Sequence, residues 1–222
     1  LCCCSDPKNS EKKNDFVAKI SRGDSYELKI EKLNAIISKN PNDVGALIER
    51  GNVALDHYDF YSAFSDAALA FRLDSNRFES RLLYAKALLN RPTSTENDKL
   101  VSKRHFLKLI DEQPKNTDAI VGLANTYALL QDFENAEILI EKALKIDAKY
   151  IDAHRLKGSI FKIRYFAIKD DAESKKFAEA LFDSTVTTYS YITQIDPEYH
   201  VAYMHLGLLF QQKCIIGPPS ID

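Results

Sequence analysis

Apolar side chains recur along this chain at the three- and four-residue spacing of one α-helix face, and residues 117–150 show it best. The apolar positions are Ile120, Leu123, Ala124 and Tyr127 in the first half of this segment, and Ala136, Ile140 and Ala143 in the second. Such spacing is typical of amphipathic helices. The polar pair Gln131-Asp132 between the halves indicates a tight turn. The segment is therefore predicted to form a helical hairpin.

The same arrangement recurs with a period close to 34 residues. Small residues expected at mid-helix lie at gaps of 34, 39, 34 and 49: Gly51, Ala85, Ala124, Gly158 and Gly207. Chain-breaking positions show the same four gaps: Pro41, Ser75, Pro114, Ala148 and Pro197. A fixed period of this length indicates stacked helical hairpins. We expect the five extra residues of the second copy near residues 90–95. The fifteen of the last copy should add about two turns to each helix, which would absorb them without a loop.

The copy from Thr117 to Tyr150 resembles a tetratricopeptide repeat in seven or eight slots at fixed spacing. Weaker copies extend the resemblance over roughly residues 10 to 213. It implies an all-α, tetratricopeptide-type helical-hairpin solenoid, a right-handed superhelix. We expect a lipobox remnant and polar tether over 1–14, about three to four full repeats with terminal half-repeats over 15–213, and a tail over 214–222. Because no Gly/Ser/Pro-rich linker interrupts the period, one continuous solenoid is predicted.

Composition and motifs argue against several classes of function. The 30 basic and 32 acidic residues are spread along the chain, and no basic stripe of the kind that nucleic-acid binding needs is visible. No His-Glu-x-x-His, Gly-x-Ser-x-Gly or Gly-rich phosphate loop is present. The sequence therefore predicts a non-enzyme with no catalytic residue, no metal, no cofactor and no nucleic-acid partner. No apolar run reaches the roughly 18 residues that a membrane-spanning helix needs.

The first residues suggest a membrane anchor. Leu1-Cys2-Cys3-Cys4 resembles the lipobox of bacterial lipoproteins, with Leu1 as its leucine and Cys4 as the acylated residue. Two Cys in the middle positions depart from the usual pattern, so acylation at Cys2 or Cys3 stays open. The polar stretch that follows fits a tether. The expected location is the bacterial cell envelope, lipid-anchored in the periplasm or at the outer membrane. The alternative is a signal-peptide remnant or a palmitoylated cytoplasmic protein.

The resemblance also implies a binding surface, because the first helix of each repeat lines a groove in this family. The expected partner-binding residues are Ile48, Asn52, Leu55, Leu82, Lys86, Leu89, Val121, Asn125, Ala128, Arg155 and Ser159. Asn in these slots is typical of members that bind peptides, since an amide donates to and accepts from a peptide backbone. The family's clamp for acidic chaperone tails needs a Lys where this chain has Ile48, so that partner is not expected. In the alternative interpretation a neighbouring helix or tail covers the apolar row.

These observations predict a non-catalytic adaptor or scaffold that binds another protein. A carrier or transporter accessory protein that holds a small apolar ligand is the alternative. At the C-terminal end, Tyr203, Leu206, Gly207 and Phe210 begin a repeat whose second helix is missing. We expect this apolar face to be covered, either by Ile215 and Ile216 folding back or by another chain, of which a second copy is the simplest form.

Overall fold

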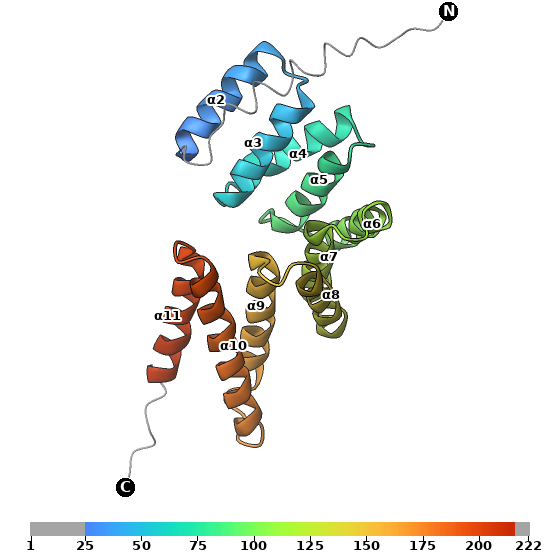
Figure 1. The fold of residues 1–222 in the computed structure, drawn as a ribbon. Helices are drawn as coiled ribbons and strands as arrows, with labels where there is room; N and C mark the ends of the chain where they lie inside the picture. The colour runs from blue at the N-terminus through green and yellow to red at the C-terminus, as the bar shows by residue number, and fades with distance from the viewer. Residues whose placement is uncertain (1–24, 216–222) are drawn as a thin grey trace, which may run out of the picture. The chain divides into compact units, whose positions relative to one another are not determined.

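The computed structural model describes residues 25–215, and these residues form α-helices and no strand (Figure 1). The helices are α2 (Tyr26–Lys39), α3 (Val44–Asp56), α4 (Phe60–Leu73), α5 (Phe78–Asn90), α6 (Glu96–Glu112), α7 (Thr117–Leu129), α8 (Phe133–Ile146), α9 (Ile151–Ile168), α10 (Lys175–Ile195) and α11 (His200–Ile215). The prediction of an all-α chain of helical hairpins is confirmed. Cys4 and the rest of the proposed anchor lie outside the described residues, as does Ile216.

Consecutive helices pack against each other as hairpins. The pairs are α3 with α4, α5 with α6, α7 with α8, and α9 with α10, while α2 packs on α3 and α11 on α10. The helices group into two compact units, residues 25–112 and residues 113–215. Within each unit the first helices of adjacent hairpins also touch, α3 with α5 and α7 with α9. A single continuous solenoid through both units stays a prediction.

Polar side chains in the connecting turns fix where many of the helices begin. At six N-termini a side-chain oxygen accepts a hydrogen bond of 2.9–3.3 Å from the backbone N–H three residues later, the residues being Ser25, Asp43, Asp59, Thr95, Asn116 and Asp132. Each satisfies a backbone donor that has no partner inside its helix. The turns before α4 and α8 are alike, since Tyr58 and Gln131 both have positive φ, 62° and 64°. The turn predicted at Gln131-Asp132 is confirmed.

The small residues of the period lie where helices meet. Those in the four complete copies are buried: Gly51, Ala85, Ala124 and Gly158. A Cβ added to Gly51 would lie 2.7 Å from Cδ2 of Leu83 on α5, and one on Gly158 would lie 3.0 Å from the ring of Tyr189 on α10. Side-chain atoms therefore occupy the space that a larger residue would need. Gly207 differs, because it is exposed and a Cβ there would meet nothing within 4 Å.

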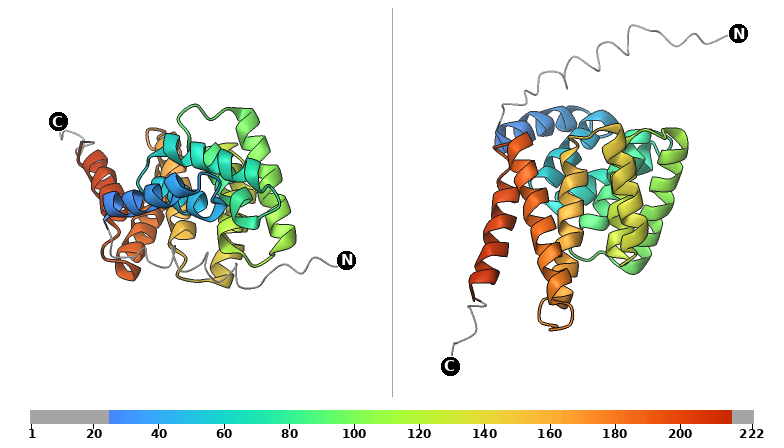
Figure 2. Two further views of the ribbon diagram at one scale, coloured as in Figure 1. Left: turned by 90° about the horizontal axis from the view of Figure 1, so that it is seen from above. Right: turned by 60° about the horizontal axis from the view of Figure 1, so that its bottom comes forward.

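The extra residues of the last copy lengthen its helices. α9 and α10 have 18 and 21 residues, against 13 and 14 in α7 and α8. Figure 2 shows α9 and α10 running side by side to their connecting loop, residues 169–174. The predicted lengthening of both helices is confirmed, by five and seven residues, but the expectation that the helices absorb all fifteen is not met, because the loop of 169–174 is three residues longer than that of 130–132. In the second copy the expectation is only partly right, since some of the five extra residues extend α6, which has 17 residues against 14 in α4.

The C-terminal helix keeps an exposed apolar face within this chain. Tyr203, Met204, Leu208 and Phe210 are all about half exposed. Ile215 is the last residue of α11, so the backbone at this position continues the helix instead of turning back. The two predicted covers of this face, the tail beyond residue 215 and another chain, stay predictions.

Candidate functional site

The predicted groove residues of the first unit come from α3 and α5, which contact each other. Ile48 is buried in the core of this unit together with Leu47 and Leu83, and Leu55 packs half-buried against the same core. Leu89 is buried as well. These three apolar side chains therefore already have partners within the chain. Their burial agrees with the alternative interpretation, in which a neighbouring helix or tail covers the apolar row.

The remaining predicted residues of this unit present polar and apolar groups to solvent. Asn52, Leu82 and Lys86 are each partly exposed. Within the residues that the structure describes, the Asn52 amide forms no hydrogen bond. The surface on α3 and α5 thus combines an unsatisfied amide, an apolar side chain and a cation.

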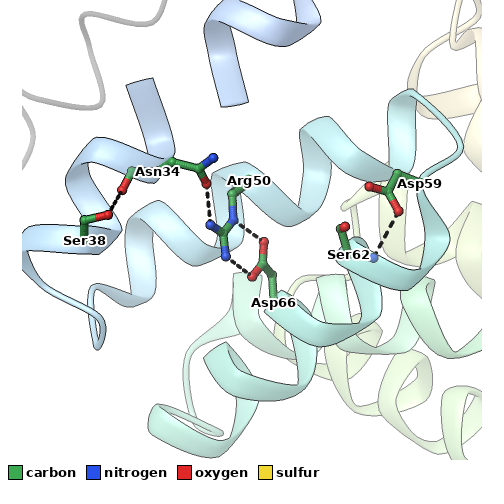
Figure 3. A network of polar contacts seen from close by, with 6 residues as sticks. All are labelled: Asn34, Ser38, Arg50, Asp59, Ser62 and Asp66. Carbon is green, nitrogen blue, oxygen red and sulfur yellow. Dashed lines mark hydrogen bonds and ion pairs between the residues drawn. The ribbon is translucent and has the colours of Figure 1, made fainter. Parts of the chain in front are cut away.

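A polar network also joins α2, α3 and α4 in the first unit (Figure 3). The Arg50 guanidinium donates from Nε to one Asp66 oxygen at 2.7 Å and from Nη2 to the other at 2.6 Å. Its Nη1 donates to the Asn34 side-chain oxygen at 2.6 Å. The hydrogen bond to Asp66 raises the pKa of Arg50. Because three hydrogen bonds to Asp66 and Asn34 hold the guanidinium in place, we interpret this network as a structural connection between the three helices.

In the second unit the predicted residues come from α7 and α9, which also contact each other. Val121 is buried, whereas Asn125 and Ala128 are partly exposed. The Asn125 amide, like that of Asn52, has no hydrogen-bond partner in the described part of the chain. Both lie one residue after the buried small position of their repeat, Gly51 and Ala124. Structurally equivalent helices thus display the same free amide.

Arg155 and Ser159 continue this surface along α9. Arg155 Nε donates to Asp152 Oδ1 at 3.1 Å, and Ser159 Oγ lies 3.1 Å from the Tyr189 hydroxyl.

The structure also brings together two residues that sequence reasoning did not pair. Lys162 Nζ lies 3.0 Å from Nδ1 of His205 on α11, 43 residues away along the chain.

The His205 imidazole is kept neutral by its surroundings. Burial, followed by the charges of Lys162 and Arg155, lowers its pKa to about 4. Burial also lowers the pKa of Lys162. A neutral imidazole can accept at Nδ1 a hydrogen bond from the Lys162 ammonium. Arg155, Ser159, Lys162 and His205 thus form a basic, hydrogen-bonding patch on α9 and α11.

Across residues 25–212, no three His, Cys, Asp or Glu side chains gather closely enough to hold a metal ion. None of the described helices combines the length and the hydropathy needed to cross a bilayer.

Comparison with known proteins supports this architecture. A family model described as tetratricopeptide repeat matches residues 103–160. This segment is tetratricopeptide repeat. It contains the hairpin of α7 and α8, the copy in which the sequence resemblance is most complete. The tetratricopeptide fold suggests a scaffold for protein–protein interaction, and repeats of this kind are generally not catalytic.

Solved tetratricopeptide structures and other helical-repeat structures share the fold at low sequence identity. A human IFIT1 dimer with m7Gppp-AAAA matches at a TM-score of 0.69 and 15% identity, over 85% of this chain and 42% of that one. TTC0263, a thermophilic tetratricopeptide protein of Thermus thermophilus, matches at 0.63 and 11%, over 84% and 91%. The ArsTM double mutant of MamA RS-1 matches at 0.52 and 19%, over 84% and 97%. The chain thus spans about two fifths of the IFIT1 chain.

At these identities the likeness concerns the fold alone. Comparison with curated proteins by sequence gave no significant match. Neither the IFIT1 nor the TTC0263 structure supports the alternative function, a carrier of a small apolar ligand.

Proposed function

We propose that this protein is a non-catalytic adaptor that binds extended segments of other proteins along the first helices of its repeats, each unit offering a surface of its own. The observation that carries the proposal is the pair Asn52 and Asn125. Both occupy the same repeat position, both are partly exposed, and neither amide forms a hydrogen bond among the described residues. An Asn side chain that both donates and accepts can pair with the backbone of an extended segment.

Neighbouring side chains define what such a segment would meet. On α5, Leu82 offers an apolar contact and Lys86 a cation, both partly exposed. On α9, Arg155 and Ser159 offer further donors. Three residues of the predicted set are buried and contribute to the core instead of to the exposed surface: Ile48, Leu89 and Val121. A segment with an apolar and an acidic side chain would match Leu82 and Lys86 in the first unit. One with acidic or polar side chains would match Arg155 and Ser159 in the second.

The test is affinity capture from a native membrane fraction, with the proteins retained identified and quantified. The double variant Asn52→Ala/Asn125→Ala should retain markedly less of a partner that the wild type retains, because two backbone-pairing groups are gone. Asn97→Ala is the matched control, since Asn97 is an exposed amide on α6, a second helix. If the double variant and the control retain the same proteins in the same amounts, the amide pair does not bind the partner.

A second variant tests the apolar part of the surface. Leu82→Glu places a charge where a partner's apolar side chain would sit, so partner capture should weaken while the fold is kept. Circular dichroism and thermal melting check the fold. If folding collapses and capture per folded molecule is unchanged, Leu82 belongs to the core.

We further propose that the adaptor is a bacterial envelope lipoprotein, anchored to the membrane through acylated Cys4. The spacing from Leu1 and the polar stretch after Cys4 support this. Metabolic labelling with palmitate should mark the protein, and Cys4→Ser should abolish the label. A label that survives this change would move the site to Cys2 or Cys3, and an unlabelled wild type would end the lipoprotein proposal.

A further inference from the structure

The second unit has a surface groove of about 740 Å³ between α8, α9 and α10. Its two most exposed apolar side chains are Ile138 on α8 and Phe177 on α10, 61% and 59% exposed. Phe161 and Leu181 also line it. Exposed apolar side chains that gather in one groove and are rimmed by polar residues mark interaction sites.

The groove is separate from the proposed adaptor surface. On α9 it uses Lys157, Phe161 and Arg164, whereas the adaptor surface uses Arg155, Ser159 and Lys162. The two sets are offset by two residues, which is about 200° around a helix of 3.6 residues per turn. They therefore lie on opposite sides of α9, and binding at one leaves the other open.

Charged side chains make the two ends of the groove different. Two of its three acids are paired across to α9, Glu137 with Arg164 and Glu141 with Lys157, each at 2.6 Å. The charges that remain are Glu134 near the start of α8 and Lys145 near its end, neither of which forms an ion pair within the described residues. They are eleven residues apart, or about 16 Å along the helix axis at 1.5 Å per residue. The groove is thus acidic at one end, apolar in the middle and basic at the other end.

We propose that this groove docks an amphipathic helix of a different protein, about three turns long. Its apolar stripe would lie between Ile138 and Phe177. A basic side chain at one end would meet Glu134, and an acidic side chain at the other would meet Lys145. Helices dock into such grooves through apolar anchors one turn apart, while flanking charges set orientation and specificity.

The charges also argue against a second copy of this chain as the occupant. The exposed apolar helix that a second copy would offer is α11, with Tyr203, Met204 and Leu208 on its surface. From His200 to Gln212 that helix has no Asp or Glu. It would leave Lys145 unpaired, so a helix from another protein fits the groove better.

Binding of synthetic helical peptides to the full chain tests the proposal. Three fluorescein-labelled 14-residue peptides share one apolar stripe and differ only at the ends: one basic and one acidic end, two acidic ends, or two basic ends. Because a helix can lie in the groove in either direction, the order of the opposite charges is immaterial. Fluorescence anisotropy should show the oppositely charged peptide binding at least tenfold more tightly than the other two.

Protein variants locate the binding. Ile138→Glu and Phe177→Glu should each weaken binding of the preferred peptide at least tenfold, whereas Tyr61→Glu, at an exposed aromatic residue of the first unit, should leave it unchanged. Glu134→Lys makes both ends basic and should shift the preference to the doubly acidic peptide. The proposal is overturned if no peptide binds, if the three peptides bind alike, or if Phe177→Glu binds as the wild type does.

Discussion

The guanidinium of Arg50 and the carboxylate of Asp66 join α3 to α4 through two parallel hydrogen bonds of 2.7 and 2.6 Å. The Asp66 side chain is only 5% exposed, and that of Arg50 is 25% exposed. Removing one partner of such a pair leaves the other charge without a counter-ion in a largely dry place, which costs far more than the pair itself contributes. The hairpin's stability therefore depends on both residues being present.

Asp66→Ala should lower the free energy of unfolding by about 3–5 kcal/mol. Urea denaturation followed by circular dichroism measures this. Glu79→Ala is the matched control, because Glu79 pairs with Arg77 at the surface, with side chains 56% and 42% exposed. Breaking an exposed pair should change stability by no more than about 1 kcal/mol. Equal effects of the two substitutions would contradict the role assigned to the buried pair.

The glycines of the period should respond to alanine in opposite ways. Gly51→Ala forces a Cβ to within 2.7 Å of Leu83 Cδ2, and Leu83 is fully enclosed, so overpacking should cost about 1–3 kcal/mol. Gly207→Ala meets no atom within 4 Å and should stabilise α11 by up to about 1 kcal/mol through helix propensity. Thermal unfolding of both variants measures these changes in stability. If Gly51→Ala left the stability unchanged, the α3–α5 contact would be looser than described.

Ala124→Leu probes the same repeat position in the second unit. Ala124 is fully buried in α7, so the extra carbons of leucine cannot be accommodated without moving neighbours. We expect a loss of about 1–3 kcal/mol in the free energy of unfolding. Ala180→Leu on α10 is a control, since Ala180 is exposed. Unchanged thermal stability of Ala124→Leu would show the repeat register to be wrong.

His205 should titrate far below an ordinary histidine. Its pKa is lowered to about 4 by burial, Lys162 and Arg155, so the fold favours the neutral ring. Its contribution to stability is therefore complete above the ordinary value near 6.5 and is lost as the pH falls through about 4. NMR of the ring Cε1–H measures this pKa.

Lys162→Met should raise the pKa of His205, because it removes the nearer cation, 3.0 Å from the ring nitrogen. Lys176→Met, an exposed position on α10, should leave that pKa where it is. A His205 pKa near 6.5 in the wild-type protein would contradict the described contact with Lys162.

Much of the fold could be predicted from sequence because it depends on local periodicity. Two independent series with identical gaps located the hairpins, and the turn at Gln131-Asp132 followed from its polar pair. Burial of Ala124 and Gly158 followed from the same register. Because these features repeat along the chain, a single sequence is enough to reveal them.

The site was harder to predict because it depends on contacts between distant helices. Nothing in the sequence pairs Lys162 with His205, and the burial of Ile48 depends on how closely α5 packs beside α3. The groove left one signal that sequence reasoning missed. Ile138 is an apolar residue on the polar face of α8, between Glu137 and Glu141, where a solvated helix would have a charge.

The loop that joins the lengthened α9 and α10 offers a practical way to study the protein. Its residues Asp170 to Glu173 are all exposed and lie beyond the last turn of α9. Exposed loop tips of small and polar residues accept insertions well, because no core contact is broken. An affinity peptide or a fluorophore placed here would leave both chain ends untouched, so that acylation, peptide docking and partner capture could all be followed on one labelled molecule.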